Sequence, residues 1–219
     1  MNTLVIRIIC LVVGYAFGSI QSAYFYGKMT KGIDIREHGS GNAGTTNTIR
    51  VLGTKAGVIV LLADAFKCII PMLIMGSVFG KAYPDLVYLF KSWTFLGAVL
   101  GHDYPFYMNF KGGKGVACLA GFAVAYDIRL LPLAILLFFV PFFITHTVSM
   151  CSLILYSGIF LALIVMGQTG LLGAVPQGAL IQIYVIQAFL TFLCFWRHRA
   201  NIGRLLNGKE SKIYLTKKK

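Results

Sequence analysis

Acidic side chains, and charge in general, are scarce in this sequence. Asp and Glu number 7 in 219 residues, against 20 Lys and Arg, and all charged residues together make up 12%. Hydrophobic residues account for 58%, and the mean hydropathy is +0.77. A soluble domain has about 25% charged and about 45–50% apolar residues. The composition therefore argues against an ordinary soluble domain and favours an integral membrane protein.

Signals for cysteine chemistry and for metal binding are also missing. The five cysteines lie mostly in apolar runs without C-x-x-C spacing, at Cys10, Cys68, Cys118, Cys151 and Cys194. The four histidines form no H-E-x-x-H motif and no cluster with carboxylates. The sequence therefore predicts packed thiols, no metal site and no cofactor.

The excess of positive charge indicates an anionic partner. In a soluble domain a net charge of +13 would point to nucleic acid. Here the aromatic residues lie in apolar runs, and the charge lies in the connections between them. Lipid head groups and phosphorylated small molecules are therefore the expected partners, and nucleic acid is not expected.

Long apolar runs predict a bundle of membrane helices. At about 20 residues per crossing, the candidate spans are residues 4–26, 56–79, 86–101, 116–126, 130–145, 149–167 and 181–196. The fourth is short enough to cross only in part, and the first is expected to be a retained span rather than a cleaved signal peptide. We expect an all-α polytopic membrane bundle of about seven transmembrane helices, forming a single domain over residues 1–219.

Basic residues set the predicted orientation. Lys and Arg concentrate in alternate connections and at the end of the chain, including Lys217, Lys218 and Lys219. Positively charged loops are retained in the cytoplasm. The N-terminus is therefore expected outside and the C-terminus in the cytoplasm, with three polar segments on the cytoplasmic side.

The first of these segments, the first motif, is GSGNAGTTNTIR at residues 39–50. Glycines let a backbone approach an anion closely, and the polar side chains can bind it. The candidate phosphate-binding residues are Ser40, Gly41, Asn42, Thr46, Asn47 and Arg50. The segment also satisfies G-x-G-x-x-G, but a membrane span precedes it where a dinucleotide fold needs a strand. The alternative is an ordinary polar turn between helices.

The second motif is FKGGKG at residues 110–115. It fails the P-loop pattern because Gly115 follows Lys114. It still places two ammonium groups and a glycine-rich turn before a predicted helix N-terminus, which suits phosphate. Lys111, Gly112, Gly113 and Lys114 are therefore candidate phosphate-binding residues; the alternative is a pair of lysines snorkelling at the membrane boundary.

The third motif is HRANIGRLLNGKE at residues 198–210. His198, Asn201 and Arg204 are spaced by three, which places them on one helical face. His198 is a candidate to orient a phosphate or carbonyl group, whereas the alternative is a basic helix lying on anionic lipid. Ser149 could cap the sixth span or reach the site.

Two charges fall inside a predicted span. Asp64 and Lys67 are three residues apart and so share a helix face. An isolated charge is costly in a membrane. We expect the two side chains to pair.

The motifs, taken with GSI at residues 18–20, KGIDIREHGSGNAGTTN at 31–47, GHDYP from 101 and HRANIGRLL at 198–206, resemble the PlsY family of bacterial acyl-phosphate:glycerol-3-phosphate acyltransferases. The resemblance spans nearly the whole chain. It implies transfer of a fatty acyl group from acyl-phosphate to glycerol 3-phosphate, giving lysophosphatidic acid and phosphate, the first acylation of phospholipid synthesis. It also implies a bacterial cytoplasmic membrane location with the active site facing the cytoplasm.

Within that hypothesis, His198, Asn201, Ser40 and Arg50 are the expected catalytic residues. Ser149 joins the candidate phosphate-binding set. Both substrates carry phosphate, and the activated donor requires positioning and charge stabilisation rather than a covalent nucleophile. No histidine begins an H-x-x-x-x-D pattern, so the His/Asp acyltransferase mechanism is not expected.

Two other functional classes remain open from the residues. A membrane transporter for phosphate or glycerol 3-phosphate would also use basic loops, but should show repeat symmetry and polar residues near mid-membrane. A non-catalytic lipid-binding scaffold would explain the basic tail but not three separate polar motifs.

Overall fold

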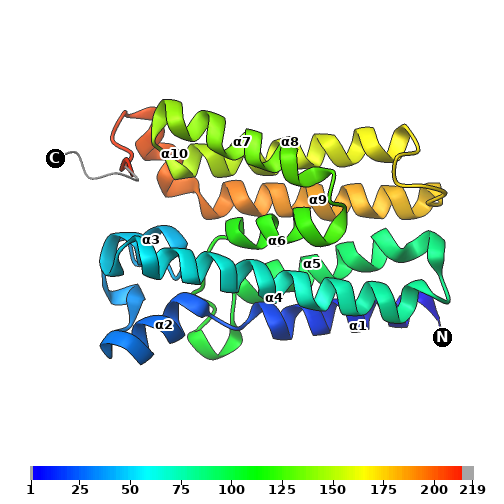
Figure 1. Cartoon of the computed structure of the whole chain (residues 1–219), viewed down its shortest axis with the longest axis horizontal. Coiled ribbons are helices and arrows are strands. Elements are labelled where there is room, and N and C mark those ends of the chain that lie inside the picture. The colour runs from blue at the N-terminus through cyan, green and yellow to red at the C-terminus, as the bar shows by residue number, and fades with distance from the viewer. Residues whose placement is uncertain (1, 214–219) are drawn as a thin grey trace.

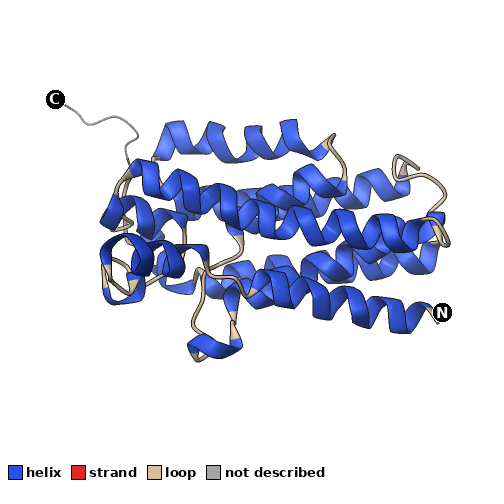
Figure 2. Ribbon diagram, turned by 60° about the horizontal axis from the view of Figure 1, so that its bottom comes forward, coloured by secondary structure: helices blue, strands red, loops and turns tan. Residues whose placement is uncertain are grey.

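The computed structural model describes residues 2–213, and the described part is helical throughout its regular structure (Figures 1 and 2). The helices are α1 Thr3–Gly18, α2 Ser22–Lys31, α3 Thr45–Leu52, α4 Thr54–Gly80, α5 Val87–Asp103, α6 Val116–Tyr126, α7 Leu130–Thr145, α8 Val148–Gln168, α9 Gln177–Arg197 and α10 Arg199–Leu206. Short 3-10 turns are η1 Ile35–Glu37, η2 Pro84–Leu86 and η3 Phe106–Met108. Lys217, Lys218 and Lys219, which entered the predicted orientation, lie outside the described residues.

Four helical stretches of the described chain are long and apolar enough to cross a membrane. They are Thr3–Lys31, which comprises α1 and α2, and the helices α4, α8 and α9. The predicted all-α membrane bundle is therefore confirmed at this level. The helices α6 and α7 begin and end at the predicted residues, but both are shorter than these four stretches. The 11 residues of α6 rise about 16 Å, roughly half of a bilayer core.

The predicted first span differs from the structure. Residues 4–26 do not form one helix, because α1 ends at Gly18 and α2 begins at Ser22. The side chain of Gln21 is buried and donates to the carbonyl groups of Gly101 (3.4 Å) and His102 (3.0 Å) on α5. A polar anchor to another helix thus accompanies the break, which hydropathy alone does not reveal.

Glycines interlock α1 and α5. A Cβ atom added to Gly14 would lie 2.0 Å from the Thr94 carbonyl oxygen, and one on Gly18 would lie 2.1 Å from that of Ala98. On α5, Gly97 and Gly101 meet carbonyl oxygens of α1 in the same way, at 2.1 and 2.3 Å. Both helices therefore carry a small-x-x-x-small pattern, which allows the close approach typical of membrane helix pairs.

The short helix α6 lies inside the bundle. Most of its side chains are buried, and a Cβ on Gly121 would lie 2.3 Å from the Ala65 carbonyl oxygen of α4. Phe122 stands between Phe95 of α5 and Tyr126, with ring centroids 4.4 Å away in each case. This packing fixes the start of α6, and with it the second motif that immediately precedes it.

The predicted pairing of Asp64 with Lys67 is confirmed. Their charged atoms lie 2.8 Å apart within α4, and both side chains are buried.

All three polar motifs lie toward one end of the bundle. Figure 1 shows α3, α10 and the connection between α7 and α8 at the left. The start of α1 and the α4–α5 and α8–α9 connections lie at the opposite end. The elements that carry the first and third motifs therefore lie at the same end of the bundle.

Candidate functional site

A hydrogen-bonded cluster around Glu210 joins the second and third motifs. Lys114 Nζ donates to Asn201 Oδ1 over 2.5 Å, and Asn201 Nδ2 donates to Glu210 Oε1 over 2.7 Å. The same carboxylate accepts from Ser149 Oγ (3.0 Å) and Arg204 Nε (2.7 Å). Asn201 and Arg204 meet the same carboxylate, as two members of the predicted face, whereas His198 precedes α10 and is not among the partners of Glu210 in the described residues. Ser149 reaches this cluster rather than capping α8. The carboxylate thus joins α8 to α10, and Asn201 links it to Lys114 of the second motif.

The chain after α10 carries Glu210 back to the bundle. Gly208 has φ +65°, and the Lys209 N–H donates to the Arg204 carbonyl over 2.8 Å. Further on, the Ile213 N–H donates to the His146 carbonyl over 2.9 Å, and the Ile213 side chain is buried. The sequence analysis includes Glu210 only as the last residue of the third motif and does not predict it as a site residue. Its signal was a single carboxylate within a basic terminal segment.

His198 presents a fixed tautomer. Its ring is buried, and Nδ1 lies 2.8 Å from the Cys194 carbonyl oxygen. A carbonyl only accepts, so we assign the proton to Nδ1, which leaves Nε2 with an open lone pair. Burial, and then the charge of Lys114, lower the pKa of His198 to about 4. At neutral pH His198 is therefore an uncharged hydrogen-bond acceptor.

The charges around this cluster favour an anion. Burial, followed by repulsion from Arg197, lowers the pKa of Lys114 to about 8. Burial opposes ionisation of Glu210, but hydrogen bonds from Asn201, Arg204 and Ser149 outweigh it and hold its pKa below the ordinary value. Glu210 is paired with Arg204, and Arg197 Nε lies 3.9 Å from Asp103 Oδ2, whereas Lys114 has no carboxylate partner in the described part of the chain and is repelled by Arg197. An incoming phosphate would relieve that repulsion.

The glycine-rich turn is held from both sides. The N–H groups of Gly112 and Gly113 donate to the carbonyls of Asp103 (3.1 Å) and His102 (2.9 Å) at the end of α5. Their own carbonyls accept from Arg197 Nη2, at 3.1 and 2.7 Å. These two glycines thus direct their N–H groups to α5, and contact of either with a phosphate stays a prediction.

Asn47 organises the first motif from within. It is fully buried, donates to the carbonyls of Ile35 (3.0 Å) and His38 (2.9 Å), and accepts from the Ser40 N–H (2.8 Å). Gly39 has φ +62°, and a Cβ there would lie 2.3 Å from Asn47 Oδ1. The geometry therefore gives Asn47 the role of shaping the loop.

Other groups of the first motif are available to a ligand. The helix α3 begins after Gly44 without a side-chain cap hydrogen bond, and helix geometry gives its first N–H groups no partner within the helix. Thr45 Oγ1 is buried and has no partner within the described residues. Ser40 and Arg50 are exposed, and Asn42 and Thr46 half-exposed, without a hydrogen bond or ion pair from their side chains in the described part of the chain.

The first and second motifs line the same cleft, and the segments that precede them are in contact. Arg36, which is paired with Asp34 at 2.7 Å, donates to the Met108 carbonyl over 3.3 Å. An open cleft of about 360 Å³ lies here, lined by Asp34, Arg36, Glu37, Gly41, Asn109 and Lys111. Lys111 thus borders the first motif, while Lys114 joins the third. The second motif is the bridge between the other two.

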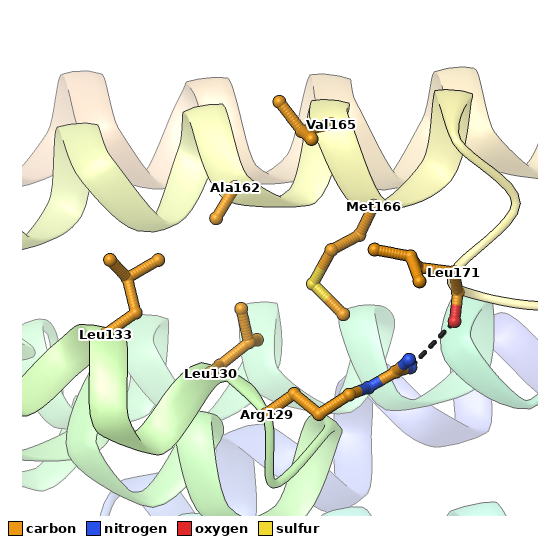
Figure 3. A pocket seen from close by; sticks show the side chains of 7 residues that line it. All are labelled: Arg129, Leu130, Leu133, Ala162, Val165, Met166 and Leu171. Atoms are coloured by element: carbon orange, nitrogen blue, oxygen red, sulfur yellow. Dashed lines mark hydrogen bonds between the residues drawn. The ribbon is translucent and has the colours of Figure 1, made fainter.

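A separate apolar groove lies between α7 and α8 (Figure 3). It has about 350 Å³ and is lined by Arg129, Leu130, Leu133, Ala162, Val165, Met166 and Leu171. Arg129 is paired with Asp127 at 2.6 Å and donates to the Leu171 carbonyl over 2.7 Å. This groove contains none of the predicted site residues.

The fold and the site together define an integral membrane enzyme class in which cationic, glycine-bearing turns gather at one end of a helical bundle. The family model for glycerol-3-phosphate acyltransferase matches residues 8–208. The chain belongs to the glycerol-3-phosphate acyltransferase family.

Curated relatives match over nearly their whole length. Glycerol-3-phosphate acyltransferase 2 of a Bacillus cereus strain is 39% identical over 208 residues, covering 94% of this chain and 95% of the relative. The glycerol-3-phosphate acyltransferase of Enterococcus faecalis is 40% identical over 212 residues, covering 94% and 91%.

Two solved structures of an integral membrane glycerol 3-phosphate acyltransferase share the fold of this chain. The crystal structure of PlsY (YgiH), an integral membrane glycerol 3-phosphate acyltransferase, in its glycerol 3-phosphate form superposes with a TM-score of 0.80 at 33% identity, covering 95% of this chain and 96% of that one. Its lysophosphatidic acid form gives a TM-score of 0.76 at 31% identity, with 95% of each chain covered.

Proposed function

We propose that this protein transfers a fatty acyl group from acyl-phosphate to glycerol 3-phosphate, giving lysophosphatidic acid and inorganic phosphate. This would be the first acylation step of phospholipid synthesis. Family membership supports the acceptor. The observation that carries the site is the placement of the two lysines of the second motif, Lys111 beside the first motif and Lys114 in contact with the third. A reaction between two phosphate-bearing substrates needs two adjacent anion sites, and this arrangement supplies them.

In the proposed membrane placement the motif-bearing end faces the cytoplasm, in the bacterial inner membrane. The bundle would have seven membrane helices, α1, α4, α5, α6, α7, α8 and α9, of which the short α6 would cross only in part. The N-terminus would then lie outside and α10 inside. The concentration of basic residues in the motif-bearing connections supports this orientation.

One phosphate would bind at the first motif. The uncapped N-terminus of α3 offers N–H groups, Ser40 and Thr46 offer hydroxyls, and Arg50 and Lys111 offer charge. The other phosphate would bind between Lys114 and Arg197, with Asn201 and Ser149 alongside. The assignment of donor and acceptor to these two sites is a question for experiment.

The transfer step forms an ester bond between a glycerol hydroxyl oxygen and the acyl carbon, and breaks the bond from that carbon to the phosphate oxygen. Nε2 of His198 would accept the hydrogen bond of the attacking hydroxyl and orient it. A histidine with a pKa of about 4 is too weak a base to keep the proton. The proton would pass to the departing phosphate, whose developing charge Lys114 and Arg197 stabilise.

The test is a donor comparison with the purified protein. Glycerol 3-phosphate is supplied with palmitoyl phosphate, palmitoyl-CoA or palmitoyl-acyl carrier protein, and lysophosphatidic acid and free phosphate are measured. We expect both products with palmitoyl phosphate alone. Turnover with a thioester donor, or none with any donor, would contradict the proposal.

A further inference from the structure

Three titratable side chains that are not among the residues assigned to substrate meet in the interior of the bundle. Asp64 and Lys67 of α4 and His102 of α5 have side chains that are 1%, 4% and 3% exposed. Lys67 Nζ lies 2.8 Å from Asp64 Oδ1 and 2.8 Å from His102 Nδ1. The proposed reaction uses none of the three.

Every proton of the Lys67 ammonium group is committed. An ammonium group has three donors, and the acceptors here are Asp64 Oδ1, His102 Nδ1 and the Ile20 carbonyl oxygen at 2.7 Å. Because Lys67 can only donate, Nδ1 of His102 must accept, which places the ring proton on Nε2. The ring of His102 is therefore fixed in tautomer and in orientation.

His102 in turn supports the glycine-rich turn of the second motif. Its carbonyl oxygen accepts from the Gly113 N–H at 2.9 Å and from Gln21 at 3.0 Å. The tip of its ring stands where a side chain of residue 113 would be, because a Cβ on Gly113 would lie 2.0 Å from Nε2. The next residue is Lys114, whose ammonium group contacts Asn201.

The same cluster also bonds to the chain segment that leads to the first motif. Ile20 lies in the break between α1 and α2, and Ser22 at the start of α2 donates to Asp64 Oδ1 over 2.8 Å. The helix α2 then leads to η1 and residues 39–50. One buried charge cluster thus touches the approaches to two of the three motifs.

We propose that Asp64, Lys67 and His102 form a positioning cluster that holds Gly113, and through it Lys114, in register with the third motif. The inference rests on the proposed function, since it concerns the accuracy of that same site. A charge pair needed only to join helices could be replaced by apolar side chains of similar volume. A pair with that role alone would not need the further hydrogen bond from Lys67 to His102, whose ring lies against Gly113 of the second motif.

The test measures kinetics and folding separately. The double variant Asp64→Asn/Lys67→Met removes both charges together, and His102→Phe keeps ring volume while removing the Nδ1 acceptor. We expect both to melt cooperatively in detergent. Displacement of Lys114 should raise KM for one of the two phosphate substrates, measured separately, by about 10- to 100-fold, leaving KM for the other within about twofold. Lys91→Met is the matched control, because Lys91 is also a helix-borne lysine, but binds the Ala125 and Tyr126 carbonyls at the end of α6.

A double-mutant cycle tests the contact between ring and turn. Gly113→Ala places a methyl group on the His102 ring, and His102→Ser removes that ring. Each single variant should lose turnover, and the combined variant should lose no more than the worse single one. Losses that multiply would overturn the proposal.

Unchanged KM values in folded Asp64→Asn/Lys67→Met or in His102→Phe would also overturn it. If the charge-removed variant does not fold, His102→Phe and the cycle decide the question. The wild type and Lys91→Met report on the proposed function itself. Their failure to turn over would refute that function, whereas normal wild-type turnover with unaltered variants would refute only the positioning role.

Discussion

Lys114 and Asn201 lie 87 residues apart in the sequence, yet Lys114 Nζ donates to Asn201 Oδ1 over 2.5 Å. This contact couples the turn before α6 to the start of α10. It therefore makes the position of one cation depend on two distant parts of the chain.

Removing that cation should stop transfer without unfolding the protein. Lys114→Ala is expected to lower turnover by about 100-fold or more, because a developing negative charge loses a preorganised partner. Acyl-phosphate-dependent release of phosphate measures this, with detergent melting as the check on folding. Arg50→Ala should behave alike. Lys81→Ala is the control, since Lys81 is exposed at the opposite end of α4. Near-normal rates in either site variant would remove that residue from the site.

The alkaline limb of the pH profile should belong to Lys114. Its pKa is lowered to about 8, so the cation is present below that pH and is lost as the pH rises through it. We expect kcat/KM, which reports the free enzyme, to fall above about pH 8. Lys114→Arg keeps its charge at all accessible pH values, so whatever activity remains should not decline there. An identical alkaline limb in Lys114→Arg would assign it to another group.

For turnover, Nε2 of His198 should matter more than Nδ1, which is bonded to the Cys194 carbonyl. His198→Gln places an amide near the position of Nε2, whereas His198→Asn replaces only the group near Nδ1. We expect Gln to retain about 10-fold more turnover than Asn, because only Gln can accept a hydrogen bond from the attacking hydroxyl. The reverse order would show that the Nδ1 contact with Cys194 is the functional one.

Glu210 should act through Asn201. Glu210→Ala leaves the donors of Asn201, Ser149 and Arg204 without their shared acceptor, so we expect turnover to fall and the free energy of unfolding to drop by about 1–3 kcal/mol. Glu210→Gln should recover part of both, because it still accepts hydrogen bonds. Assay of product formation and detergent melting on the same preparations distinguishes the two effects. Full activity in Glu210→Ala would contradict the role of this carboxylate.

The close approach of α1 and α5 should tolerate no side chain at residue 97. A Cβ on Gly97 would lie 2.1 Å from the Leu11 carbonyl oxygen, so Gly97→Ala is expected to cost about 1–3 kcal/mol of stability. Gly178→Ala is the matched control, since nothing lies within 4 Å of its Cβ position. Thermal melting should fall for the first variant and stay level or rise for the second.

Much of the architecture could be predicted from local sequence. The predicted apolar runs 116–126 and 130–145 coincide with α6 and α7, because Asp127 and Arg129 interrupt the hydrophobic sequence between the two helices. The break at residues 19–21 could not be predicted, since Gln21 is anchored by carbonyls 80 and 81 residues further on. In the same way, the residue types of the first motif do not indicate that Asn47 donates to the carbonyls of Ile35 and His38 and so closes its own loop.

Sequence by itself determined that this chain is a membrane protein of helices, and marked three polar segments as candidates for binding anions. Both follow from local properties: the free energy of transferring apolar runs out of water, and the residue types that anions require. Only the tertiary structure decided that Lys111 lines a cleft with the first motif and that Lys114 contacts the third. Only the tertiary structure brings Glu210 to the donors of Asn201, Ser149 and Arg204. It also places the buried Lys67 beside His102, behind the glycine-rich turn. Those relationships depend on the packing of helices between residues up to 87 positions apart in the sequence, and local sequence spacing does not predict such contacts.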